Sequence, residues 1–216
     1  MNTTDRRNWL KTIALGGGFT LLGGVQGYAS LIADHPTPLE GPAKLNSYEN
    51  PYGPSDSVRK VIQENFDSGC RYPFQYIKAL VRDIAKKEEV SEDCIVITGG
   101  STEGLKAAGL VYGLEGGEIV AADPTFQALL RYAEYFGGYV HRVPLDETLT
   151  HDLDAMERRV TGKTRLIFIC NPNNPSGTLL DAGRLRDFGS STASKAVVFS
   201  DEAYYDYITE PDYPSM

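Results

Sequence analysis

From about residue 94 onward, short apolar runs alternate with segments whose apolar residues recur every three or four positions. Apolar runs rich in β-branched and aromatic residues are typical of buried strands, and the three-to-four spacing is typical of amphipathic helices. The predicted strands are residues 94–98, 118–122, 139–145, 166–170 and 196–200. A helix is predicted to open at residues 99–103 and run to about 114, and another to follow the turn at 123–126 and run through residue 136. Two more are predicted over residues 152–160 and 181–190.

This alternation of strand and helix predicts an α/β fold, a doubly wound and mostly parallel sheet. Two more amphipathic helices precede it, over residues 57–66 and around residues 77–85. Ser55 or Asp56 is the expected N-cap of the first one.

Two of the predicted strands end in unusual polar sequences. Residues 166–170 run into the rigid loop NPNNPSG, and residues 196–200 run into DEAY. Ligands of α/β sheets bind at the carboxyl edge of the strands. We therefore expect Asn174, Asp201 and Tyr204 to converge on one crevice.

A third polar sequence, GGSTE, lies between the strand predicted at 94–98 and the following helix. Free N–H groups and the helix dipole make a helix start a potential anion site, and glycine permits close approach of the anion. The candidate anion-binding residues are Gly100, Ser101 and Thr102. An ordinary helix cap can have the same sequence. Phe126 follows the next strand, either as a site residue or as the first buried residue of its helix.

The pair NPNNPSG and DEAYYDY resembles the large domain of the fold-type I pyridoxal-phosphate aminotransferases, most closely the histidinol-phosphate aminotransferase branch. The resemblance implies that Asp201 keeps the pyridine nitrogen of pyridoxal 5′-phosphate protonated and that Asn174 and Tyr204 donate to the ring's 3′ oxygen. It also implies that Phe126 stacks on the ring. GGSTE resembles the family's phosphate turn, which implies that Gly100, Ser101 and Thr102 hold the phosphate.

The same resemblance extends to the N-terminal arm. LN…ENPYGP is similar to a segment that crosses the active-site mouth, with a plain surface loop as the alternative. Tyr72, in the sequence RYP, is similar to a tyrosine that reaches the cofactor phosphate of the partner subunit; a turn tyrosine is the alternative. A homodimer is therefore expected for the full-length family, acting on a small-molecule amino donor and a 2-oxo acid.

One essential residue of such an enzyme is missing. Transamination needs a Schiff-base lysine that also moves a proton, and in the family it follows the D-x-A-Y motif. No lysine follows Lys195, which precedes a five-residue strand and so lies ~16 Å from the Asp201 end. No catalytic residue is assigned, and we expect this chain, a fragment or a relic of such an enzyme, to be inactive alone.

Other functions stay open on the sequence alone. A decarboxylase or lyase can use the same cofactor on the same fold, and a non-catalytic remnant can retain the crevice. A dinucleotide-binding Rossmann domain is disfavoured because GGSTEG lacks the G-x-G-x-x-G spacing.

Composition narrows the function classes further. The formal net charge of −8 disfavours binding to nucleic acid through phosphate neutralisation. The three cysteines, Cys70, Cys94 and Cys170, have neither metal-ligand spacing nor a disulfide pattern, so no metal is expected.

The first 29 residues have a different composition from the rest of the chain. Residues 1–29 combine paired arginines, a weakly apolar Gly-rich segment and a small-x-small site, and they resemble a twin-arginine export signal. The apolar segment is too short for a stable membrane span. We expect a periplasmic or extracytoplasmic protein with a linker and N-terminal arm or helix over 30–70 and a partial cofactor-binding large domain over 71–216.

Overall fold

The computed structural model describes residues 47–50 and 52–216, which fall into two compact units divided after Pro73. The predicted export signal lies outside the described residues, and the predicted boundary after residue 70 stays a prediction.

The first unit contains α2 (Asp56–Glu64) and the 3₁₀ helix η1 (Phe66–Cys70). The Ser55 hydroxyl caps α2 by accepting a hydrogen bond from the Val58 amide at 3.4 Å, which confirms the helix and one of its two expected caps. The α-helix ends two residues before the predicted limit, and the tighter η1 follows Asn65.

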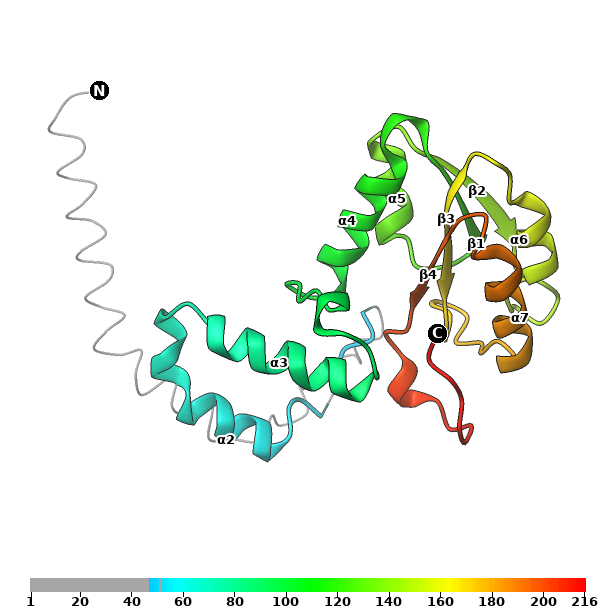
Figure 1. Cartoon of the computed structure of the whole chain (residues 1–216). Helices are drawn as coiled ribbons and strands as arrows, with labels where there is room; N and C mark the ends of the chain where they lie inside the picture. The colour runs from blue at the N-terminus through cyan, green and yellow to red at the C-terminus, as the bar shows by residue number, and fades with distance from the viewer. Residues whose placement is uncertain (1–46, 51) are drawn as a thin grey trace, which may run out of the picture. The chain divides into compact units, whose positions relative to one another are not determined.

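The second unit contains a four-stranded parallel sheet in the order β2-β1-β3-β4 (Figure 1). The strands are β1 (Glu118–Asp123), β2 (Tyr139–Pro144), β3 (Thr164–Cys170) and β4 (Val197–Asp201). The helices are α3 (Phe74–Lys87), α4 (Ser101–Gly113), α5 (Ala128–Tyr135), α6 (Leu153–Arg159) and α7 (Ala182–Thr192). Short 3₁₀ helices are η2 (Glu92–Cys94), η3 (Leu114–Gly116) and η4 (Tyr205–Tyr207).

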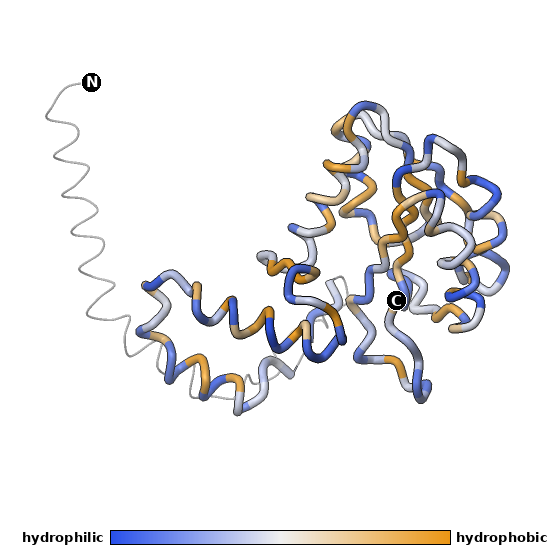
Figure 2. The backbone as a smooth tube through the Cα atoms, viewed as in Figure 1, coloured by the Kyte–Doolittle hydropathy of each residue, from blue (hydrophilic) through white to orange (hydrophobic). Residues whose placement is uncertain are grey.

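Helices cover both faces of this sheet, as the alternation predicted (Figure 1). Successive strand residues point to opposite faces, so Ile119 packs against α4 and α5 while Val120 packs against α6 and α7. Both side chains are fully buried. In Figure 2 the strands are coloured mainly as hydrophobic, whereas the helices around them alternate between hydrophobic and hydrophilic residues. The predicted doubly wound α/β fold is therefore correct.

The C-terminal end of α4 packs closely against α5. A Cβ added to Gly113 would lie 2.8 Å from the Cα and 2.9 Å from the Cβ of Ala133. Glycine at this position allows the two helix backbones to approach more closely than any other residue would. Leu105, one turn into α4, is anchored in the same core.

The predicted strand over residues 94–98 is wrong. Ile95 has extended backbone angles, but the segment after η2 joins no sheet, and Val96 is 81% exposed. A strand requires a neighbouring strand to accept and donate its backbone hydrogen bonds. The apolar pattern indicated the extended backbone correctly, whereas pairing depends on a partner that the described chain does not supply.

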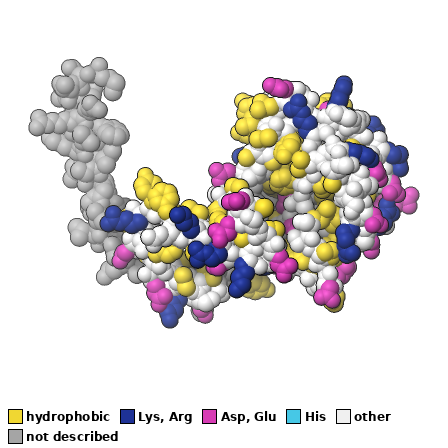
Figure 3. All heavy atoms as spheres, in the orientation of Figure 1, with side chains coloured by type: hydrophobic (Ala, Val, Ile, Leu, Met, Phe, Trp, Pro, Cys, Tyr) yellow, Lys and Arg dark blue, Asp and Glu magenta, His cyan; other side chains and the backbone are white. Residues whose placement is uncertain are grey.

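No described helix of the protein combines the length and the apolar content that crossing a bilayer requires. Figure 3 shows hydrophobic side chains reaching the surface over α4 and α5, where Tyr135 and Phe136 contact each other edge to face. The sheet also ends in an edge strand, β4, on which Val197 is exposed.

Candidate functional site

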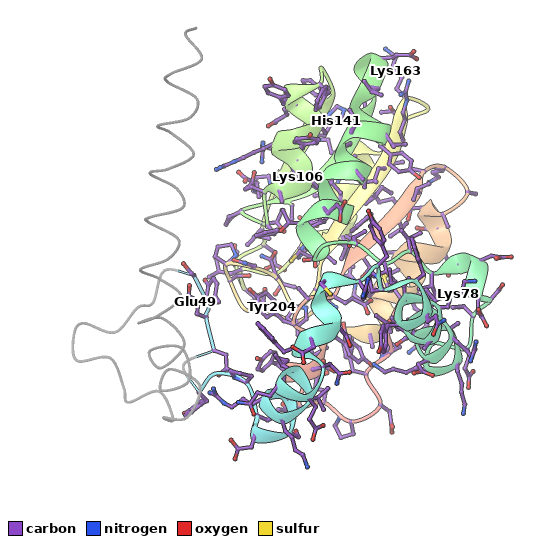
Figure 4. All side chains as sticks on the ribbon, turned by 90° about the vertical axis from the view of Figure 1, so that its left-hand side faces the viewer. Glu49, Lys78, Lys106, His141, Lys163 and Tyr204 are labelled. Atoms are coloured by element: carbon purple, nitrogen blue, oxygen red, sulfur yellow. The ribbon has the colours of Figure 1, made fainter. Side chains whose placement is uncertain are left out.

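The strand order has a topological switch point between β1 and β3, next to the strand ends that carry the candidate residues. β1 pairs with β2 on one side and with β3 on the other, so the chain winds in opposite directions from this point. Open α/β sheets bind ligands at such a switch point, beyond the carboxyl ends of the strands. Figure 4 shows that Tyr204, after the carboxyl end of β4, and Lys163, before β3, lie toward opposite ends of the sheet.

Buried polar contacts bridge the loops that follow β1 and β3. The Thr125 hydroxyl donates to Oδ1 of Asn173 at 2.8 Å, and Nδ2 of Asn173 donates to the Pro124 carbonyl at 3.2 Å. The same Nδ2 donates to the Ser176 hydroxyl at 2.8 Å. Because Asn173 is buried and fully engaged, its role is to hold the two loops together.

Asn171 ties the end of β3 to the last residues of the chain. Its Nδ2 donates to the Tyr213 hydroxyl at 2.8 Å, and its Oδ1 accepts from the Leu180 amide at 2.9 Å. The Tyr213 hydroxyl in turn donates to the Leu180 carbonyl at 2.8 Å. Asn171 is therefore also a structural residue.

The third asparagine of the loop behaves differently. Nδ2 of Asn174 donates to the Tyr204 hydroxyl at 3.4 Å, which joins the loop after β3 to the turn after β4. Both residues are half-buried. The sequence predicted that Asn174 and Tyr204 converge, but it assigned no role to Asn171 or Asn173.

Asp201 completes the cluster from the end of β4. It is 7% exposed, and its Oδ1 accepts one hydrogen bond, from the Ala203 amide at 3.3 Å. Burial raises the pKa of this carboxyl group, and the neighbouring Glu202 carboxylate adds to the effect. A buried carboxylate without a cation among the described residues is suited to binding a cationic group.

Cys170 lies near Asp201, and Phe126 packs against the core cluster that contains Cys170. Burial, and secondarily the Asp201 carboxylate, raises the pKa of the Cys170 thiol to about 11. Phe126 is half-buried against the cluster that contains Cys170, so it packs in the core and still presents part of its ring. The two alternatives for Phe126 in the sequence are therefore compatible.

The turn before α4 has the geometry expected of an anion site. Gly100 has φ of +86°, and an added Cβ there would meet nothing within 4 Å. Within the described chain, no acceptor lies within hydrogen-bond distance of the Ser101 and Thr102 amides. The Gly99 amide is instead taken by the Glu103 carboxylate, a contact that the sequence reasoning missed.

No group of three or more metal-ligating side chains occurs in the described part of the chain, so the described residues offer no metal centre. Beside the turn, an open hollow of about 510 Å³ is lined in part by Gly99, Thr102, Glu103 and Lys106. The turn is thus accessible from the surface of α4.

Comparison with known families agrees with this geometry. The model of the family "Aminotransferase class I and II" matches residues 41–216, which include both units of the described chain and every crevice residue. The chain belongs to this aminotransferase family.

Several relatives of this chain are named histidinol-phosphate aminotransferases. This chain is 40% identical over 172 residues to the histidinol-phosphate aminotransferase of Moorella thermoacetica. The match covers 80% of this chain and 44% of the relative. Against the Bacillus subtilis enzyme of the same name, identity is 35% over 176 residues, covering 82% of this chain and 49% of the relative. This aminotransferase chain thus spans about half the length of the curated relatives it matches.

Solved structures show the same fold. A histidinol-phosphate aminotransferase homologue from Erwinia carotovora atroseptica superposes with a TM-score of 0.74 at 24% identity, covering 81% of this chain and 51% of that one. The enzyme from Sinorhizobium meliloti, solved in complex with pyridoxal 5′-phosphate, gives a TM-score of 0.66 at 22% identity, covering 72% of this chain and 42% of that one.

The crevice residues of this aminotransferase chain fit the family's cofactor. Asp201 is a shielded carboxylate that would be stabilised by a protonated ring nitrogen, and Asn174 and Tyr204 supply adjacent donors. Open amides at Ser101 and Thr102 fit a phosphate.

Tyr72 and Lys195 were the other two residues considered from the sequence. Tyr72 is in the first unit and is 84% exposed, so its reach to a partner subunit stays a prediction. Lys195 precedes β4, and its Nζ lies 3.6 Å from the Glu157 carboxylate, away from the carboxyl edge of the sheet. This lysine therefore does not serve the crevice.

Proposed function

We propose that the crevice at the carboxyl ends of β3 and β4 binds pyridoxal 5′-phosphate. We further propose that the protein is an aminotransferase of the histidinol-phosphate type. Its substrates are then an amino acid or amino-phosphate compound and a 2-oxo acid. The observation that carries this proposal is the Asn174–Tyr204 hydrogen bond at the sheet edge where β4 ends in the buried Asp201.

When bound, pyridoxal phosphate supplies an electron sink for the bonds of the substrate's α-carbon. Asp201 would hold a proton at the ring nitrogen. Burial disfavours the charged carboxylate by itself, as its raised pKa indicates, and a cation at hydrogen-bond distance reverses that penalty. An ion pair in this sheltered position is stronger than one in water.

Asn174 and Tyr204 would orient the ring by donating to its 3′ oxygen, since their polar atoms already meet. Phe126 would cover one face of the ring with the exposed part of its side chain. The Ser101 and Thr102 amides and hydroxyls would hold the phosphate at the positive end of α4.

The proton transfer at the substrate carbon requires a base that these residues do not provide. No lysine follows Lys195 in the sequence, and Lys195 is paired with Glu157. We therefore propose that the described chain binds the cofactor without transferring amino groups. Transfer would belong to a protein that also contains the half of the relatives' length that this chain does not span.

Equilibrium dialysis of the 216-residue chain against pyridoxamine 5′-phosphate tests the cofactor site, because this amine does not react with surface lysines as the aldehyde does. We expect saturable binding, and we expect Asp201→Ala to weaken it at least about tenfold, consistent with loss of a charged hydrogen bond. Asp206→Ala removes an equal charge from an exposed neighbouring turn and serves as the control.

Absence of saturable binding, or equal weakening by both substitutions, would contradict the proposed site. The same samples, supplied with pyridoxal phosphate, histidinol phosphate and a 2-oxo acid, should form no amino-acid product. Measurable product would show that the described chain is competent alone.

A further inference from the structure

The start of α4 has two kinds of backbone amide. The Gly99 amide donates to the Glu103 carboxylate and the Gly100 amide donates to the Thr98 carbonyl at 2.8 Å, so both are engaged. The amides of Ser101 and Thr102, which follow directly, have no acceptor in the described chain. Within the described chain the Gly99 and Gly100 amides are therefore satisfied, whereas the Ser101 and Thr102 amides are open, as the first amides of a helix are.

Glu103 provides the acceptor for the first of these amides, that of Gly99. It stands at the third position of α4, from which a glutamate can reach back to an amide before the helix. Here it passes the N-cap Gly100 and engages Gly99 instead. A Cβ on Gly99 would lie 3.1 Å from the carboxylate, so the glutamate lies against the glycine backbone.

The hydrogen bond between the Gly99 amide and the Glu103 carboxylate, called the clamp below, restrains the two glycines of the turn. Gly99 and Gly100 lack side chains, and Gly100 adopts φ of +86°, which other residues rarely adopt. Thr98 holds the other side, because its hydroxyl donates to the Gly100 carbonyl at 2.8 Å. Without the carboxylate, ordering of the two glycines would have to accompany anion binding and would reduce affinity.

From these contacts we propose that Glu103 is a positioning residue for the cofactor phosphate. Its carboxylate fixes the Gly99–Gly100 backbone so that the Ser101 and Thr102 amides are preorganised for the anion. The inference rests on the proposed function, because it concerns the phosphate end of the same site. The hydrogen bond, rather than the negative charge, carries the effect, since a carboxylate near a phosphate is by itself repulsive.

The test compares two ligands that differ only in the phosphate, pyridoxamine 5′-phosphate and pyridoxamine, by equilibrium dialysis with the full chain. The ratio of their affinities isolates the phosphate contribution from the ring contribution. Glu103→Ala removes the clamp, and Glu103→Asp keeps the charge but is one methylene too short. Glu103→Gln keeps an acceptor of the same length without the charge.

We expect Glu103→Ala and Glu103→Asp to lower the affinity ratio about fivefold, the effect of one lost hydrogen bond. Glu103→Gln should keep the ratio within about twofold of the native chain or raise it. Asp187→Ala, which removes a charge from the exposed face of α7, is the matched control and should leave the ratio unchanged.

An unchanged ratio in Glu103→Asp, or a loss in Glu103→Gln as large as that in Glu103→Ala, would overturn the positioning role. A purely structural cap would lower the melting temperature and leave the ratio unaltered, which also overturns it. If the native chain itself does not prefer the phosphorylated ligand, the proposed cofactor site fails at its phosphate end.

Discussion

Cys170, the last residue of β3, lies opposite Asp201, the last residue of β4, in the parallel register. The Asn171 amide then donates to the Asp201 carbonyl at 3.0 Å, so the two strands end at the same level. Asn174 and Tyr204 follow these strand ends by four and three positions and meet across the edge. This shared end point is what brings separate loops to one crevice.

The environment of Cys170 predicts an unreactive thiol. Its pKa of about 11 leaves roughly one thiolate in a thousand at pH 8, and the side chain is buried, whereas Cys70 and Cys94 are exposed. Titration of the native chain with iodoacetamide at pH 8 should modify two thiols quickly and the third only after unfolding. Rapid modification of Cys170, identified by mass spectrometry, would contradict the packing described here.

His151 predicts a loss of stability in mild acid. The residue is 4% exposed, and its Nε2 has no hydrogen-bond partner within the described chain. Burial lowers the pKa of His151 from 6.5 to about 4, although the Asp146 carboxylate opposes the shift. The unfolded chain therefore binds the extra proton first, and the folded state loses up to about 3 kcal/mol as the pH falls from 6.5 to 4.

Urea unfolding at intervals between pH 7 and 4 measures this effect. His151→Gln should flatten the dependence of unfolding free energy on pH in that window. His141→Gln is the control, since it removes a histidine whose Nε2 has a hydrogen-bond partner, the Glu118 carboxylate, at 2.8 Å. An equal slope in native chain and His151→Gln would contradict the assignment.

Much of the fold was predictable because it depends on local pattern. Four of the five predicted strands occur, and the apolar side chains of β1 and β3 are buried as expected. Residues 94–98 failed because strand formation needs a neighbour, which no local pattern specifies. Long-range pairing is the part of the sheet that sequence periodicity leaves open.

The candidate site divides in a similar way. Convergence of Asn174 with Tyr204 followed from the ends of two parallel strands. The roles of Asn171 and Asn173 did not, because three asparagines in one loop have the same chemistry and differ only in what surrounds them. Glu103 was overlooked for the related reason that a helix-start glutamate is common and its target amide depends on loop geometry.

The buried hydrogen bonds of Asn173 predict that its truncation lowers the stability of the fold, an effect separate from any loss of ligand binding. Its truncation to alanine removes hydrogen bonds to Thr125, Pro124 and Ser176 and leaves the buried Thr125 hydroxyl without its acceptor. We expect Asn173→Ala to lower the free energy of unfolding by about 2–3 kcal/mol in urea. Asn65→Ala, which removes one exposed hydrogen bond, should cost far less; equal costs would argue against a bridging role.

The paired arginines near the chain start predict twin-arginine export. Replacing Arg6 and Arg7 together with lysine preserves charge but should retain the protein in the cytoplasm of a host with that export system. Cell fractionation followed by immunoblotting measures the distribution. Unchanged export of the double-lysine variant would exclude this route.

The most direct test of the account is the protonation state of the ligand ring. Pyridoxamine 5′-phosphate labelled with ¹⁵N at the ring nitrogen can be bound to the chain above the pH at which the free ligand loses its ring proton. We predict the ¹⁵N chemical shift of a protonated ring with the native chain and of an unprotonated ring with Asp201→Ala. The same shift in both proteins would contradict the claim that Asp201 faces the ring nitrogen.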